Sequence, residues 1–227
     1  MLDKIKKMIK GNDNLKDIKP INDRVQETKV QLQEAVVTET ASDEYLQYSA
    51  EAVGFSTRED QWNLYKATLQ YIPEASSILD FGCGRGDLHV MHLSEYGELD
   101  YIGIDMNEPL INAGKIVDPN RDIRLFDWFN LPLNITKDWC VNIGSSNLRY
   151  DADMKRSDFE YTCDTIEKMY KHAIKGIVVL LTSKNVKEDG IIQHDPGKIL
   201  NWAQDKFKNV LLDHSSSEDG FCLIIKK

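Results

Sequence analysis

The feature that most constrains the fold is a glycine-rich loop between an apolar strand and a helix. The loop reads Asp80-Phe81-Gly82-Cys83-Gly84-Arg85-Gly86-Asp87, and the apolar segment 77–81 that leads into it is typical of a short buried strand. Helical spacing follows directly over 87–96. Alternate glycines allow a tight turn and a close approach of other groups to the backbone. A strand, a glycine turn and a helix in this order predict the first unit of an open α/β sheet.

The rest of the chain repeats this alternation of strand and helix. Further strands are expected at 101–105, 123–126, 139–143, 176–181, 210–212 and 221–225, and further helices at 43–53, 62–72, 109–116, 159–173 and 196–207. The segment 176–181 is almost wholly apolar, as a central parallel strand should be. The last two strands are joined by the short segment 213–220, so they should pair antiparallel. We predict a doubly wound, Rossmann-like α/β sheet.

Two domain-level regions are expected, with a boundary near residue 42. Residues 1–41 carry a short basic amphipathic stretch over 2–10 and then a mostly polar run, which predicts an N-terminal arm, partly helical or mobile. The arm could instead dock a protein partner or a membrane surface. Residues 42–227 hold every strand signal and should form the domain. Within it, Ser56 and Ser157 each open a capping-box pattern, with an acidic residue three positions later.

Composition narrows the classes of function. The 227 residues include 37 acidic and 28 basic side chains, giving a net charge of −9, and no long basic stripe is present, so nucleic-acid binding is disfavoured. No apolar run is long enough to span a membrane. The four cysteines form no CxxC pair, and the start of the chain lacks a secretory pattern, so we expect reduced thiols in the cytoplasm and no metal site.

The glycine loop admits two nucleotide-type ligands. A dinucleotide fingerprint, counted from Gly82, wants glycine at position 87, where this chain has Asp87. A carboxylate at that helix start disfavours a pyrophosphate. S-adenosylmethionine carries no phosphate but does carry an ammonium and a sulfonium, so it suits an acidic loop better.

Acidic residues at the ends of three successive strands support that choice, because open α/β sheets bind ligands there. Asp80 can accept from the ammonium, Asp105 from both ribose hydroxyls, and Asp127 from the adenine amino group. Gly82 and Gly84 let the backbone approach the methionine portion. Each carboxylate taken alone could equally be a helix cap. The candidate cofactor-binding set is completed by neighbouring residues, namely Cys83, Met106, Trp128 and Ser145.

These segments resemble the class I S-adenosylmethionine-dependent methyltransferase family over residues 42–227. The match is carried by 78–88, by 101–105 and by Asp127-Trp128. The resemblance implies a seven-stranded sheet of order 3-2-1-4-5-7-6 with strand seven antiparallel. A narrower resemblance, over 53–56, 144–147 and 221–227, is to small bacterial and phage methyltransferases.

The acceptor side is expected in the loop after the fourth strand, Gly144-Ser145-Ser146-Asn147-Leu148-Arg149-Tyr150-Asp151. This loop lacks the Pro-Pro motif of amino-methylating DNA enzymes, and Cys140 lies within the strand with no proline beside it, unlike a cytosine-C5 nucleophile. The candidate catalytic residues are Asn147, Tyr150 and His194. His194 also precedes an ordinary helix start at Asp195-Pro196, which is its simpler interpretation.

The predicted function is therefore methyl transfer from S-adenosylmethionine to a small molecule or a protein side chain. Two alternatives stay open. One is a non-catalytic binding or assembly protein with this fold, such as a phage structural component. The other is an RNA methyltransferase within a complex that supplies the basic surface.

Overall fold

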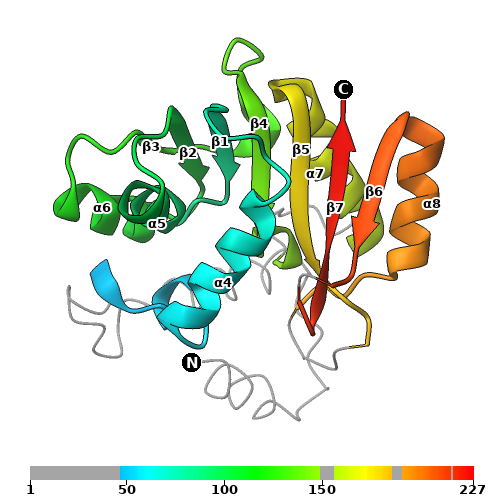
Figure 1. Cartoon of the computed structure of the whole chain (residues 1–227), viewed down its shortest axis with the longest axis horizontal. Helices are drawn as coiled ribbons and strands as arrows, with labels where there is room; N and C mark the ends of the chain where they lie inside the picture. The colour runs from blue at the N-terminus through cyan, green and yellow to red at the C-terminus, as the bar shows by residue number, and fades with distance from the viewer. Residues whose placement is uncertain (1–46, 149–155, 186–190, 216) are drawn as a thin grey trace, which may run out of the picture.

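A seven-stranded sheet organises the molecule. The computed structural model describes residues 47–148, 156–185, 191–215 and 217–227. The strands are β1 (Ile78–Phe81), β2 (Tyr101–Asp105), β3 (Ile123–Leu125), β4 (Lys137–Ile143), β5 (Ala173–Thr182), β6 (Asn209–Asp213) and β7 (Gly220–Lys226). Their order is β3-β2-β1-β4-β5-β7-β6, and β7 runs antiparallel to both of its neighbours (Figure 1). The predicted fold class and strand order are confirmed.

The parallel strands are paired so that their carboxyl ends meet at one edge. Ile78 at the start of β1 lies opposite Tyr101 of β2 and Trp139 of β4. The loops that follow β1, β2 and β4 therefore open side by side, and we call this side of the sheet the carboxyl edge. The opposite side, where these strands begin, is the amino edge.

Each face of the sheet is covered by its own helices and has its own core. On one face lie α4 (Arg58–Leu69), α5 (Asp87–Glu95) and α6 (Glu108–Val117), which pack on the side chains of Ile78, Val141 and Val178. On the other face lie α7 (Asp158–His172), α8 (Pro196–Lys206) and the short 3-10 helix η2 (Trp128–Asn130), over Leu79, Cys140 and Ile177 (Figure 1). Buried strand side chains thus alternate between two cores, as expected for a sheet buried on both sides.

One of the two predicted helix N-caps is confirmed, and the other is displaced by one residue. Ser157 forms the predicted capping box of α7 with Glu160. The predicted box at Ser56 is wrong by one residue, because the Oγ1 of Thr57 accepts from the backbone N–H of Asp60 and makes Thr57 the N-cap of α4. A short 3-10 helix, η1 (Glu51–Val53), stands where the second half of a longer helix was expected.

The predicted arm and its proposed docking role lie outside the described residues, as does the domain boundary near 42. Among the helices that the structure does describe, none combines the length and the apolar character needed to cross a bilayer.

Candidate functional site

The glycine loop is folded tightly against the ends of β2 and β4. Gly82, Gly84 and Gly86 all have positive φ, at 78°, 57° and 83°, a region that suits glycine. A Cβ added at Gly82 would lie 2.0 Å from the Ser145 Oγ, and one at Gly84 would lie 3.1 Å from a methyl carbon of Val53. The space that these two glycines leave is therefore occupied by neighbouring side chains of the protein, and a ligand can meet the loop only along its backbone.

Asp87, at the first position of α5, is fully neutralised. The Arg85 guanidinium donates to both of its carboxylate oxygens, at 2.9 and 2.8 Å, and Arg58 and Gln61 donate to Oδ2 at 3.0 and 2.9 Å. Burial would raise the pKa of Asp87, but the Arg85 bonds and charge outweigh it and hold that pKa below its usual range. Arg85 is only 1% exposed and also donates to the carbonyl of Ser49, so the cluster fastens the segment before α4 to the glycine loop.

Asp80, near the end of β1, is buried without such a partner. It is 4% exposed and accepts one hydrogen bond, from the Tyr101 hydroxyl at 2.8 Å. Among the described residues it forms no ion pair. Burial raises the pKa of the Asp80 carboxyl to about 7, against the smaller lowering effect of the Tyr101 bond.

Asp105, at the end of β2, reinforces the glycine loop from the side. Its Oδ2 accepts from the N–H of Gly84 at 2.7 Å, and its Oδ1 accepts from the N–H of Asn107 at 2.8 Å. It is 8% exposed, and burial raises its pKa despite these bonds. Among the described residues it too lacks a basic partner, so two uncompensated buried carboxyls face the same part of the carboxyl edge.

Asp127 and Trp128 have structural roles in the described chain. Asp127 caps η2, because its Oδ1 accepts from the N–H of Phe129 and its Oδ2 from the Asn130 side chain. Trp128 is among the largest fully buried side chains, so its ring faces the core and not an open site. Trp128 was expected among the cofactor-binding residues, and in the described chain its indole packs within the core.

Two further members of the candidate cofactor-binding set, Met106 and Cys83, are partly or fully buried. Met106 is half-buried and packs against the core that includes Ile104. Cys83 is a buried free thiol whose Sγ lies 2.7 Å from where a Cβ of Gly103 would be. Burial raises its pKa well above the usual range, so the thiol stays protonated.

The loop after β4 is anchored by a residue that the sequence analysis missed. Asn142, fully buried near the end of β4, donates to the carbonyl of Phe81 at 3.0 Å and to the Ser145 Oγ at 2.6 Å. Its Oδ1 accepts from the N–H of Ser146 at 3.0 Å, and the Ser145 Oγ also donates to the Phe81 carbonyl at 3.0 Å. Asn142 therefore ties the loop to the glycine loop. The available signal was an amide side chain in the otherwise apolar run 139–143.

The candidate catalytic residues divide into three cases. The Asn147 Oδ1 accepts from the N–H of Thr182, and its carbonyl accepts from Ile192, so Asn147 joins the loops after β4 and β5. His194 is 3% exposed and lies on the second of these loops, where its backbone N–H donates to Thr182. Tyr150 lies outside the described residues.

Two buried polar atoms on these same loops lack a hydrogen-bond partner within the described chain. They are the Ser146 Oγ and the His194 Nε2. Burial lowers the pKa of His194 to about 4, so its ring is neutral near pH 7. Unsatisfied buried polar atoms are costly and usually meet water or a ligand. In the described chain the carboxyl edge thus combines two buried acids that lack a basic partner, beside β1 and β2, with two buried polar atoms that lack a hydrogen bond, beside β4 and β5.

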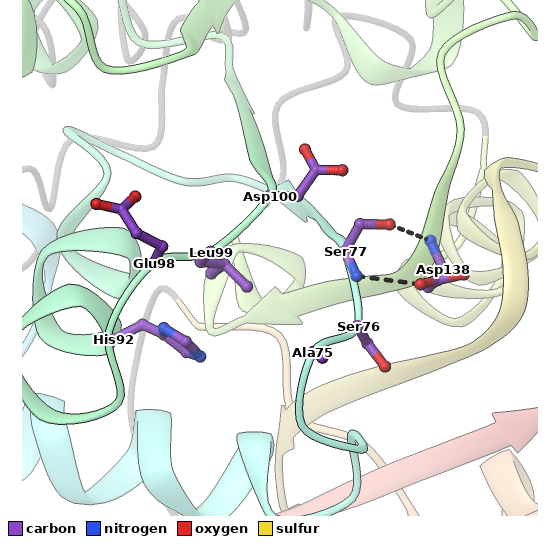
Figure 2. A pocket seen from close by; sticks show the side chains of 8 residues that line it. All are labelled: Ala75, Ser76, Ser77, His92, Glu98, Leu99, Asp100 and Asp138. Carbon is purple, nitrogen blue, oxygen red and sulfur yellow. Dashed lines mark hydrogen bonds between the residues drawn. The ribbon is translucent and has the colours of Figure 1, made fainter.

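A separate hollow lies at the amino edge of the sheet. It has a volume of about 290 Å³ and is lined by Ala75, Ser76, Ser77, His92, Glu98, Leu99, Asp100 and Asp138 (Figure 2). Ser77 and Asp138 close one wall with two mutual hydrogen bonds. Because the hollow lies away from the glycine loop, it is distinct from the candidate site.

Solved structures of several methyltransferases share the fold of this chain. No model of a known protein family matches the sequence. A magnesium protoporphyrin IX methyltransferase from Synechocystis, solved with bound S-adenosylmethionine, aligns with TM-score 0.55 and 12% identity over 92% of this chain and 98% of its own. A 1,6-didemethyltoxoflavin-N1-methyltransferase from Burkholderia thailandensis, solved with S-adenosylhomocysteine, aligns with TM-score 0.57 and 9% identity over 93% and 92%. The chain therefore has the class I methyltransferase fold.

One curated protein matches by sequence over a short stretch. A tRNA (carboxymethyluridine(34)-5-O)-methyltransferase from Arabidopsis thaliana is 36% identical over 86 residues, which cover 37% of this chain. The match spans only 20% of that protein's length.

Proposed function

We propose that the chain binds S-adenosylmethionine at the carboxyl edge and transfers its methyl group to an acceptor. The observation that carries the proposal is the contrast in charge around the glycine loop. Asp87, which faces the helix start, is neutralised by two arginines, whereas Asp80 and Asp105 are buried with no basic partner in the described chain. A ligand that brings positive charge and no phosphate suits such a site.

The residues present fit the cofactor by their chemistry. Asp80 would hold the ammonium, Asp105 the ribose hydroxyls, and the backbone from Gly82 to Gly84 the methionine portion, with Ser145 and Met106 nearby. Asp127 would accept from the adenine amino group with the lone pairs that its bonds to Phe129 and Asn130 leave free. The fold neighbours solved with S-adenosylmethionine or S-adenosylhomocysteine support this assignment.

The bound cofactor supplies an electrophilic methyl group on a sulfonium, and the protein's task is to position and desolvate the acceptor. The loops after β4 and β5 are suited to that task, because Asn142 and Asn147 fix them beside the glycine loop. The His194 Nε2 is neutral, buried and unpartnered in the described chain, so it can accept a hydrogen bond or a proton from an acceptor O–H or N–H. Ser146 offers a second polar contact.

We propose a small molecule as the acceptor, because fold neighbours such as the magnesium protoporphyrin IX and 1,6-didemethyltoxoflavin methyltransferases are named for small-molecule acceptors. A tRNA acceptor is the second candidate, favoured by the 36% identity to the Arabidopsis enzyme over 86 residues. The net charge of −9 disfavours it, since RNA binding relies on clustered basic side chains. The four cysteines are free thiols, which supports the cytoplasm as the compartment.

Calorimetry tests the cofactor assignment. S-adenosylmethionine and S-adenosylhomocysteine should both bind, whereas NAD and ATP should give no heat of binding. Strong NAD binding with no response to S-adenosylmethionine would overturn the proposal.

Label transfer tests the acceptor side. The protein is incubated with methyl-labelled cofactor and an extract of its source cells, and the label is traced to small molecules, protein or RNA. Tyr150→Phe should then lower turnover at least ~10-fold, about 1.4 kcal/mol in the barrier, with cofactor affinity little changed. Label that enters none of the three fractions would favour the non-catalytic alternative.

A further inference from the structure

The Asp80 carboxyl is placed where its charge state depends on what binds next to it. It lies near the end of β1 at 4% exposure, and its one hydrogen bond within the described chain comes from a neutral hydroxyl, that of Tyr101. A buried carboxylate without a cation is unfavourable, so the site prefers either a proton or a positively charged ligand.

The groups around Asp80 add negative charge and no available positive charge. From β2 come Tyr101 and the buried Asp105, whose charge acts against ionisation of Asp80. From the glycine loop comes the protonated thiol of Cys83, and from α4 the hydroxyl of Tyr65, which accepts from Gln61.

The two arginines that bind at the start of α5 are committed to another acid. Arg85 and Arg58 both bind Asp87 at the start of α5, and His89 of the same helix stacks on the outer face of the Tyr101 ring at 5.0 Å between centroids. Burial and Arg121 lower the pKa of His89, so this ring is neutral near pH 7. None of these three residues therefore supplies a counter-charge to Asp80.

We propose that a proton and the ammonium group of the cofactor compete for Asp80, so that binding of an amine-bearing cofactor expels a proton from this carboxyl to solvent. The proposal rests on the proposed function, because it assumes that Asp80 meets the ammonium. It adds that cofactor affinity is regulated by pH at this one site. The proton that occupies Asp80 in the free protein leaves when the O–H bond breaks, and the ligand's N–H groups take its place on the carboxylate.

The expected change in ligand affinity with pH follows from competition between one proton and one ligand for Asp80. With a pKa of about 7 for Asp80 in the free protein, affinity for an amine-bearing ligand should rise roughly tenfold between pH 6 and pH 8 and change little above pH 8. The α-amino group of S-adenosylhomocysteine, which has no sulfonium beside it, stays charged over this range. A ligand that lacks the amine should show no such rise.

Calorimetry with two probes provides the test. S-adenosylhomocysteine has the ammonium, and 5′-methylthioadenosine keeps the adenosine but lacks the amino-acid portion. Titrations at pH 7 in phosphate and in Tris, whose ionisation enthalpies differ, count the protons released. We expect release of roughly half a proton with S-adenosylhomocysteine and none with 5′-methylthioadenosine. Equal proton release with both probes, or none with either, would overturn the proposal.

Two variants locate the effect. Asp80→Asn should still bind 5′-methylthioadenosine as the wild type does, but should bind S-adenosylhomocysteine more weakly and with no pH dependence between pH 6 and 8. Tyr101→Phe removes the hydroxyl that favours ionised Asp80, so the rise in affinity should move to higher pH. A rise that stays at the wild-type pH in a folded Tyr101→Phe variant would place the titrating group elsewhere.

The outcomes separate this inference from the proposed function. If neither probe binds, cofactor binding itself fails. If both bind but their pH profiles run in parallel, the cofactor assignment stands and the competition at Asp80 is rejected.

Discussion

Two buried acids flank the same glycine loop and are treated in opposite ways. Asp87 receives hydrogen bonds from Arg85, Arg58 and Gln61, and its pKa is lowered. Asp80 receives one bond from a tyrosine hydroxyl, and its pKa is raised to about 7. Because both are buried, exposure does not explain the difference. What differs is whether the protein supplies the counter-charge itself.

The contrast separates a structural acid from one that is left for a ligand. A carboxylate saturated by arginines contributes to the folded state and has little left to offer a ligand. A buried carboxylate without a basic partner lowers the stability of the free protein, and the binding of a cation offsets that cost. The same distinction applies to the loop after β4. Both ends of the Asn142 side-chain amide form hydrogen bonds, whereas the Ser146 Oγ has no partner in the described chain. Substitutions can test each side of it.

The largest effect is expected at Asp87. Asp87→Ala leaves the Arg85 guanidinium buried with its main partner removed, so the free energy of unfolding should fall by about 3–5 kcal/mol. Urea denaturation measures this. Glu95→Ala is the matched control, because the Lys66–Glu95 pair is partly exposed and its loss should cost less than about 1 kcal/mol. Similar losses in the two variants would remove the basis for calling Asp87 structural.

A smaller effect is expected on cofactor binding at Asp105. Asp105→Ala should weaken S-adenosylmethionine binding by about 1.5–3 kcal/mol, because charge-assisted bonds to two hydroxyls are lost. Asp105→Asn keeps an acceptor for the Gly84 N–H and serves as the control for loop distortion. Unchanged affinity in folded Asp105→Ala would show that the ribose is held elsewhere.

Removing the charge of Asp80 is expected to stabilise the protein, whereas removing that of Asp87 is expected to destabilise it. Its pKa is raised in the folded state, so its favourable contribution is present at low pH and is lost as pH rises toward about 7. In the cofactor-free protein, Asp80→Asn should therefore raise the free energy of unfolding at pH 8 by on the order of 2 kcal/mol, and by less at pH 5. Thermal melts at the two pH values measure the difference, and a destabilised variant at pH 8 would contradict the comparison.

The smallest effect is expected at Ser146. Its Oγ has no partner in the described chain, so Ser146→Ala should change stability by less than about 0.5 kcal/mol or raise it slightly. Asn142→Ala is the saturated counterpart and should cost about 1–3 kcal/mol, because it strands the Ser146 N–H. If Ser146→Ala lowers stability as much as Asn142→Ala does, the Ser146 Oγ forms a hydrogen bond after all, and the contrast between the two residues is wrong.

The sequence was sufficient for the sheet because the determinants of strands are local. The apolar runs predicted β1 to β7, and the short segment before β7 predicted its antiparallel pairing with β6. The order of the strands was implied by the family resemblance and not by the apolar runs. Helix starts depend on one side-chain bond, which is why Ser157 was identified and Thr57 was displaced by one residue.

The site was only partly predictable because its pairing is not local. Nothing in the sequence indicates that Arg58, 29 residues before Asp87, reaches that carboxylate. Asp87 was interpreted as a carboxylate that disfavours a pyrophosphate at the helix start, and the sequence did not indicate that two arginines bind it. The burial of Trp128 could not be foreseen either, since the helix η2 that turns it inward is only three residues long.

The position of β7 has a consequence for how the molecule is made. This strand is the last of the seven in the chain, yet it lies between β5 and β6 and is buried along nearly its whole length. During synthesis β5 and β6 therefore emerge with edges that have no mate until residues 220–226 have left the ribosome. Synthesis proceeds at about 5–20 residues per second, so these exposed edges persist for at least a second or so. Such edges recruit other chains, and the nascent protein is most prone to aggregate in this interval.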